Sequence, residues 1–85
     1  MNERLQGRIT SINRTRLRIA VLLDEGGYTV ADLEDLDDLE VGDTVEGELL
    51  THGEAIWRSQ RTGRALRVYV EAFDAGAENA RQLLR

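Results

Sequence analysis

Apolar side chains recur at every second position over much of this chain, and that period restricts it to a fold made mainly of β-strands. Between residues 17 and 23, leucine, isoleucine and valine alternate with Arg18, Ala20 and Leu22, as in a strand with one buried face. The same pattern predicts further strands around residues 5–12, 28–33, 44–50 and 66–70. A chain of 85 residues with these strands forms one domain, residues 1–85, around a single modest core.

Two segments depart from this period and predict helical structure. Leu33, Leu36 and Leu39 are spaced by three, with acidic residues between them, which predicts a short helical turn. Residues 74–85 have a helical composition, and Asp74 is the predicted N-cap. The segment 54–59 is compatible with a strand or with a loop.

These elements follow one another as five strands, with the helical turn between the third and the fourth and the helix at the C-terminal end. This is the layout of a small five-stranded OB-like barrel, a mainly β fold that closes on itself and so removes exposed sheet edges. An SH3-like barrel or a curved open sheet would give nearly the same pattern.

Two stretches of sequence resemble one branch of the OB domains. QGRITSI is similar to the first strand of S1-type domains, and LEVGDTVEGELL is similar to their entry into the fourth strand. The resemblance covers about residues 5–73 and implies an RNA-binding barrel. S1-type domains usually place aromatic residues on the second and third strands for base stacking, and Tyr28 is the aromatic residue near that place here.

Charge is strongly sorted along the chain, although its net value is −5. Residues 21–54 hold twelve acidic residues and no arginine or lysine, whereas arginines dominate residues 1–20 and 55–70. In an OB-like barrel, the loops after the first and fourth strands flank the ligand face, so the two basic segments would meet there. We therefore expect single-stranded RNA or DNA to bind in a salt-sensitive way through Arg14, Arg16, Arg18, Tyr28, Trp57, Arg58, Arg61 and Arg64. Trp57, the single tryptophan, is also a candidate core residue.

A second hypothesis uses the acidic region, residues 32–48. A dense array of carboxylates can imitate a phosphate backbone and bind a basic protein surface, as small phage-encoded inhibitors do. The candidate residues for this protein-interaction surface are Asp32, Glu34, Asp35, Asp37, Asp38 and Glu40. A third hypothesis is a subunit of a larger assembly that makes contact through its C-terminal helix.

No constellation of side chains predicts an enzyme. His52 lies in a polar context that predicts an exposed loop, and Ser11 and Ser59 have no visible general base. No cofactor is expected, and no metal, because the acidic spacing is not that of a calcium-binding loop. The absence of cysteine, of a signal peptide and of a long apolar run leads us to expect a cytoplasmic protein that does not enter membranes.

Overall fold

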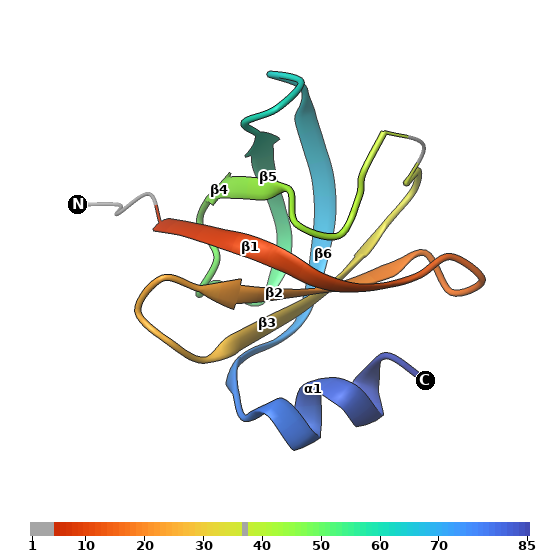
Figure 1. Cartoon of the computed structure of the whole chain (residues 1–85), viewed down its shortest axis with the longest axis vertical. Coiled ribbons are helices and arrows are strands. Elements are labelled where there is room, and N and C mark those ends of the chain that lie inside the picture. Colours follow the sequence, from red (N-terminus) through yellow and green to blue (C-terminus); the bar gives the residue numbers. More distant parts are fainter. Residues whose placement is uncertain (1–4, 37) are drawn as a thin grey trace.

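The computed structural model describes residues 5–36 and 38–85, which form a closed β-barrel with one helix beside it (Figure 1). The strands lie around the barrel in the order β1-β2-β3-β6-β5-β4, every pairing is antiparallel, and β4 closes the barrel by pairing with β1. The elements are β1 (Leu5–Asn13), β2 (Arg18–Leu23), β3 (Tyr28–Leu33), β4 (Thr44–Gly47), β5 (Gly53–Ser59), β6 (Ala65–Ala75) and α1 (Ala77–Leu83).

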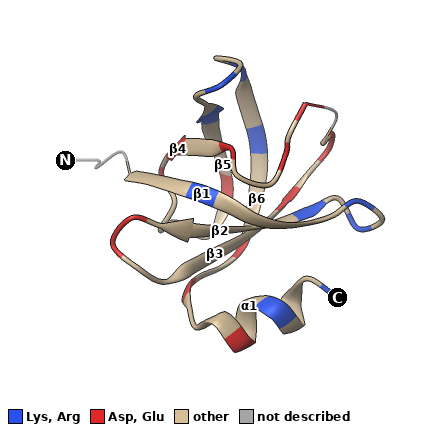
Figure 2. Ribbon diagram, in the orientation of Figure 1, with Lys and Arg blue, Asp and Glu red and all other residues tan. Residues whose placement is uncertain are grey.

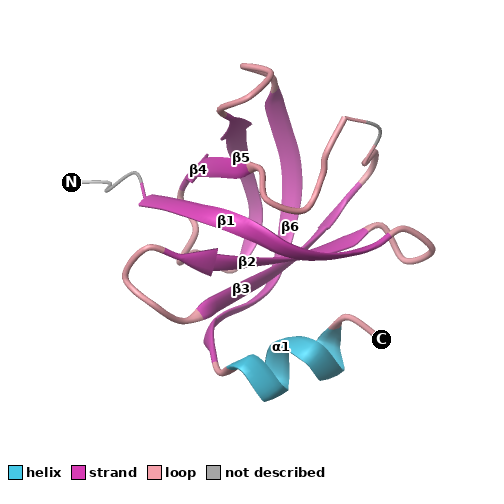
Figure 3. Cartoon of the chain, viewed as in Figure 1, coloured by secondary structure: helices cyan, strands magenta, loops and turns pink. Residues whose placement is uncertain are grey.

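This architecture confirms the predicted mainly β class and is compatible with an OB-like barrel, although it has six strands where five were predicted (Figure 3). The additional strand is β5, in the segment that the sequence left open between strand and loop. Its residues pair with β6 along one edge and, from Trp57 to Ser59, with β4 along the other. The fourth predicted strand is shorter than expected, because Gly47 takes a φ of 148° and the chain turns away after it.

The apolar side chains that alternate along the strands fill the interior of the barrel. Ile9, Ile19, Val21 and Val45 are fully buried there, and they surround Trp57, whose exposed fraction is also 0%. The indole Nε1 donates a hydrogen bond to the Glu48 carbonyl at 3.3 Å, so the polar edge of the ring is satisfied inside the core. Trp57 is thus a core residue, and its ring offers no surface for base stacking in this fold.

The segment between β3 and β4, residues 34–43, folds over one end of the barrel and is called the acidic loop below. Leu36 and Leu39 are buried against the main core, which confirms the apolar stripe expected from their spacing. The Leu39 N–H donates to the Leu36 carbonyl at 3.0 Å and closes a single turn at the place of the predicted helical turn. Asp37 lies outside the described residues.

The C-terminal helix begins later than its sequence predicted. β6 continues through Asp74, which takes a φ of 54°, and the N-cap of α1 is Gly76. Below the barrel in Figure 1, α1 lies along the outer face of β2 and β3. Ala80 is buried there against Ala20 and Val30, so the helix covers a small second core. Within the described residues, the structure contains no helix with the length and apolar character needed to cross a membrane.

Candidate binding site

Both basic loops of the chain contact the acidic loop, which lies between the β1–β2 loop and the β5–β6 hairpin (Figure 2). From the β1–β2 loop, Arg14 Nη2 donates to the Leu39 carbonyl at 3.2 Å. From the β5–β6 hairpin, Arg61 binds the Asp43 carboxylate and Arg64 binds the Asp38 carboxylate. The barrel therefore ties Arg14, Arg61 and Arg64 to one acidic loop, where they lie among carboxylates and not on a separate cationic face.

The Arg61–Asp43 contact is the most complete of these ion pairs. Arg61 Nε and Nη2 lie 2.9 and 3.0 Å from the two oxygens of Asp43, whose side chain is only 7% exposed. Asp43 also accepts the Glu40 N–H at 3.0 Å, and the guanidinium and this N–H together hold the pKa of Asp43 below its usual value. A fork of this kind fixes geometry as well as charge, so Arg61 anchors the acidic loop.

The remaining predicted nucleic-acid residues lie on other parts of the surface. Arg16 and Arg18 both donate to main-chain oxygens at the end of α1, and Tyr28 packs against the same helix. Arg58 is exposed and donates to the Gly63 carbonyl at 2.8 Å within its own hairpin. The predicted arginines therefore divide between the acidic loop, the end of α1 and the β5–β6 hairpin.

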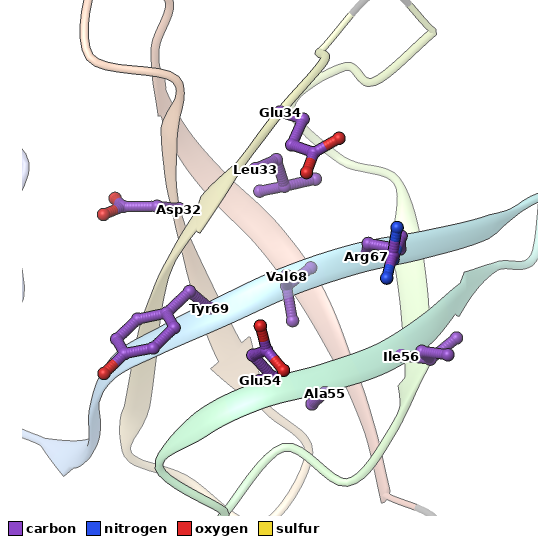
Figure 4. A pocket seen from close by; sticks show the side chains of 9 residues that line it. All are labelled: Asp32, Leu33, Glu34, Glu54, Ala55, Ile56, Arg67, Val68 and Tyr69. Atoms are coloured by element: carbon purple, nitrogen blue, oxygen red, sulfur yellow. The ribbon is translucent and has the colours of Figure 1, made fainter.

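A groove of about 450 Å³ runs across the outer surface of β3, β6 and β5 (Figure 4). Its floor is apolar, with Leu33 and Val68 only slightly exposed, and it is flanked by two exposed apolar residues. Tyr69 is 52% exposed at one end and Ile56 is 64% exposed toward the other. Exposed apolar groups concentrated in one hollow are typical of binding surfaces.

Carboxylates dominate the polar lining of this groove. Glu34 and Glu54 lie on either side of β6 in Figure 4, and Arg67 lies on the Ile56 side of the groove. Over the described part of the chain, neither Glu34 nor Glu54 makes an ion pair or a side-chain hydrogen bond. These two carboxylates are therefore available to a cation from outside.

At the edge of the groove toward β2, the lining residue Asp32 lies beside Arg18 and interacts with Glu71 on β6. Arg18 Nε lies 2.5 Å from Asp32 Oδ1, and its Nη2 lies 3.1 Å from Oδ2. These hydrogen bonds lower the pKa of Asp32 and raise the pKa of Arg18. A hydrogen bond with the Asp32 carboxyl raises the pKa of Glu71 above its usual value. Arg18 thus pairs with Asp32, while Glu71 interacts with the Asp32 carboxyl.

The groove contains only part of the acidic surface predicted from the sequence. Asp32 and Glu34 line it. Asp38 and Glu40 belong instead to the arginine-bound acidic loop, where Glu40 lies 4.0 Å from Arg61. Asp35 is exposed at the start of that loop and lines a separate hollow beside Arg14.

The sequence reasoning missed four groove residues, which are Glu54, Ile56, Arg67 and Tyr69. The signal for Arg67 and Tyr69 was present, because both alternate with the buried Val68 and Val70. The signal for Glu54 and Ile56 depended on reading residues 53–59 as a strand. In the barrel, Tyr69 lies opposite Asp32 on β3 and opposite Glu54 on β5, and this register assembles the groove.

Comparison of the chain with protein-family models, with curated proteins and with solved structures found no match. The site is therefore interpreted from its own geometry. Among the described residues, no cluster of three or more histidine, cysteine, aspartate or glutamate side chains has an arrangement that could hold a metal ion.

Proposed function

We propose that this protein is a non-enzymatic interaction module that binds a basic segment of another protein in the groove on β3, β6 and β5. The observation that carries the proposal is that Glu34 and Glu54, on either side of β6 in an apolar hollow, have no ion-pair or hydrogen-bond partner among the residues that the structure describes. An arginine or lysine side chain of a partner, placed between them, would be attracted by both carboxylates and would not displace an existing ion pair. This proposal gives the acidic-surface hypothesis a defined location.

The apolar residues of the groove add selectivity for the residues next to the basic residue in the partner segment. Ile56 and Tyr69 are more than half exposed, so burying them under a partner side chain is favourable. The Tyr69 ring can also accept a cation over its face. A segment that alternates basic and apolar residues therefore fits the groove better than a purely basic one.

Single-stranded nucleic acid, as in S1-type domains, is a second candidate ligand. It is favoured by the position of Arg14 together with Arg61 and Arg64 around one loop. It is less well supported, because Arg18, Arg61 and Arg64 already pair with carboxylates. A phosphate backbone would have to replace those contacts in a protein of net charge −5.

One titration distinguishes the two candidates. The isotope-labelled chain is titrated at low salt with a blocked hexapeptide of alternating arginine and valine, and separately with oligouridine. We expect the peptide to shift the amide signals of Glu54, Ile56 and Tyr69, whereas the matching glutamate–valine peptide leaves them unchanged. If oligouridine shifts the amide signals of Arg14 and Arg58 and the peptide shifts none, the proposal is wrong and nucleic acid becomes the favoured ligand.

Variants separate groove binding from general charge attraction. Tyr69→Ala is expected to weaken peptide binding by about tenfold, as for a moderately important interface residue. Val41→Ala is the matched control, because Val41 is 61% exposed on the acidic loop, outside the groove. Glu54→Gln is compared with Glu25→Gln, which removes the same charge from an exposed turn. Equal weakening by each variant and its control would show that the groove is not the site.

A further inference from the structure

Arg18 makes contacts with two separate parts of the molecule. Its Nε and Nη2 hold the two oxygens of Asp32 at the edge of the groove, and its Nη1 donates to the Leu83 carbonyl in the last turn of α1 at 2.7 Å. The Arg18 side chain is only 14% exposed. Because a guanidinium is planar and rigid, it cannot turn to follow one partner without changing its contact with the other.

α1 is held by polar contacts at its C-terminal end together with the packing of Leu83 and Leu84 on the small cluster around Ala80. The helix has seven residues, no side-chain hydrogen bond at its N-cap, and Ala80 as its buried residue. A helix of this length is not stable on its own in water. Its last turn is fixed by Arg18 at the Leu83 carbonyl, by Asn13 at the Leu84 carbonyl at 2.5 Å, and by Arg16 at the main-chain oxygen of Arg85. Loss of one anchor therefore opens the helix more often.

On the groove side, Asp32 is the carboxylate that a second basic residue of the bound segment would share with Arg18, next to the basic residue placed between Glu34 and Glu54. Its side chain is 32% exposed, and it lies opposite Tyr69 in the β3–β6 pairing. Glu71 on β6 interacts with Asp32, and this interaction raises the pKa of Glu71. A ligand guanidinium at this edge would complete the charge balance and draw Asp32 away from Arg18.

We propose that Arg18 couples the groove to α1, so that a cationic segment bound at Asp32 loosens the C-terminal helix from the barrel. The proposal rests on the proposed function, because it takes a basic segment as the groove ligand. By linkage, the effect is reciprocal: a chain in which α1 is already loosened binds that segment more tightly. Opening of α1 uncovers Ala20, Val30 and Tyr28. Binding in the groove would therefore expose an apolar surface on another face of the barrel.

The ligand-independent part is tested first, by amide hydrogen exchange of the full chain. Asp32→Asn removes the charge that orients Arg18 while keeping the shape of the side chain. We expect the Leu84 amide, which donates to the Ala80 carbonyl, to exchange on the order of fivefold faster or more in this variant, which is the lower end of typical coupling. The Val21 amide in the barrel is the internal reference. Unchanged exchange in α1 would overturn the coupling.

The ligand-dependent part uses the same arginine–valine hexapeptide. Saturating peptide should speed exchange at Leu84, and Leu83→Ala should tighten peptide binding several-fold, with Gln82→Ala as the exposed control on the same helix. Shifts at Ile56 and Tyr69 without any change in α1 would refute the coupling and leave groove binding intact. No binding to wild type or to Leu83→Ala would refute both.

Discussion

The ionisation state of a single residue, Glu71, affects the stability of the folded protein. Its interaction with the Asp32 carboxyl raises its pKa, whereas Arg18 lowers the pKa of Asp32. Folding therefore favours the protonated form of Glu71. Its stabilising contribution is complete below the usual glutamate pKa of about 4.3 and is lost as the pH rises through the higher value of the folded state.

Replacing Glu71 with glutamine should consequently raise stability at neutral pH. Glu71→Gln keeps a hydrogen-bond donor for Asp32 without the second negative charge. We expect a higher denaturation midpoint than wild type at pH 7, and a difference that shrinks as the pH falls below about 4.3. Urea unfolding at both pH values measures this, with Glu25→Gln as the exposed control. A stabilisation that is equal at the two pH values would contradict the assignment.

Among the elements, β4 is the one whose end is set by packing. Gly47 lies opposite Trp57 in the β4–β5 pairing. A Cβ atom at Gly47 would lie 2.9 Å from Trp57 Cδ1 and 3.0 Å from the Ile56 carbonyl oxygen, and the φ of 148° is one that other residues rarely adopt. The close approach of this backbone to the indole lets the short strand close the barrel.

Gly47→Ala is therefore expected to lower the free energy of unfolding by about 2–3 kcal/mol, through overpacking and backbone strain. Gly76→Ala is the control, because it has a φ of −74° and no atom within 4 Å of its added Cβ. That change at an N-cap should cost about 0.5–1 kcal/mol, because glycine is preferred over alanine there. Chemical denaturation measures the free energy of unfolding of both variants. Equal values for Gly47→Ala and Gly76→Ala would show that β4 can move away from the indole at no cost.

The same elements show what the sequence could predict. Alternation located β2 and β3 almost to the residue, because one face of each strand lines the main core without interruption. It could not end the fourth strand at Gly47, since that end depends on Trp57 from another strand. Nor could it show that Arg61 would pair with Asp43, a partner eighteen positions away whose position depends on the closed barrel. The groove was missed for the same reason, because the strand register assembles it.

Considered as a whole, the molecule combines one cooperative core with a weakly attached helix. The main core links residues of all six strands and the acidic loop, whereas α1 contributes to a separate small cluster with Ala20 and Val30. A single core in a chain of 85 residues is expected to unfold in one step. The helix can open at a lower cost than the barrel.

Denaturant unfolding should therefore give one transition, with the same midpoint by Trp57 fluorescence and by far-ultraviolet circular dichroism. The emission of Trp57 should shift to longer wavelength in that step, because its ring is fully buried in the native state. Amide exchange under native conditions should show α1 opening well before the β-strands. Separate midpoints for the two optical probes would contradict a single cooperative barrel.

In the closed strand order, each strand has a paired neighbour on both sides. An extended partner is thus not expected to join the sheet by β-augmentation, in which backbone groups supply most of the affinity. Recognition then rests with side chains that project from the barrel wall. Such side chains can be exchanged one at a time while the scaffold stays the same, so the groove is suited to retargeting by surface substitution.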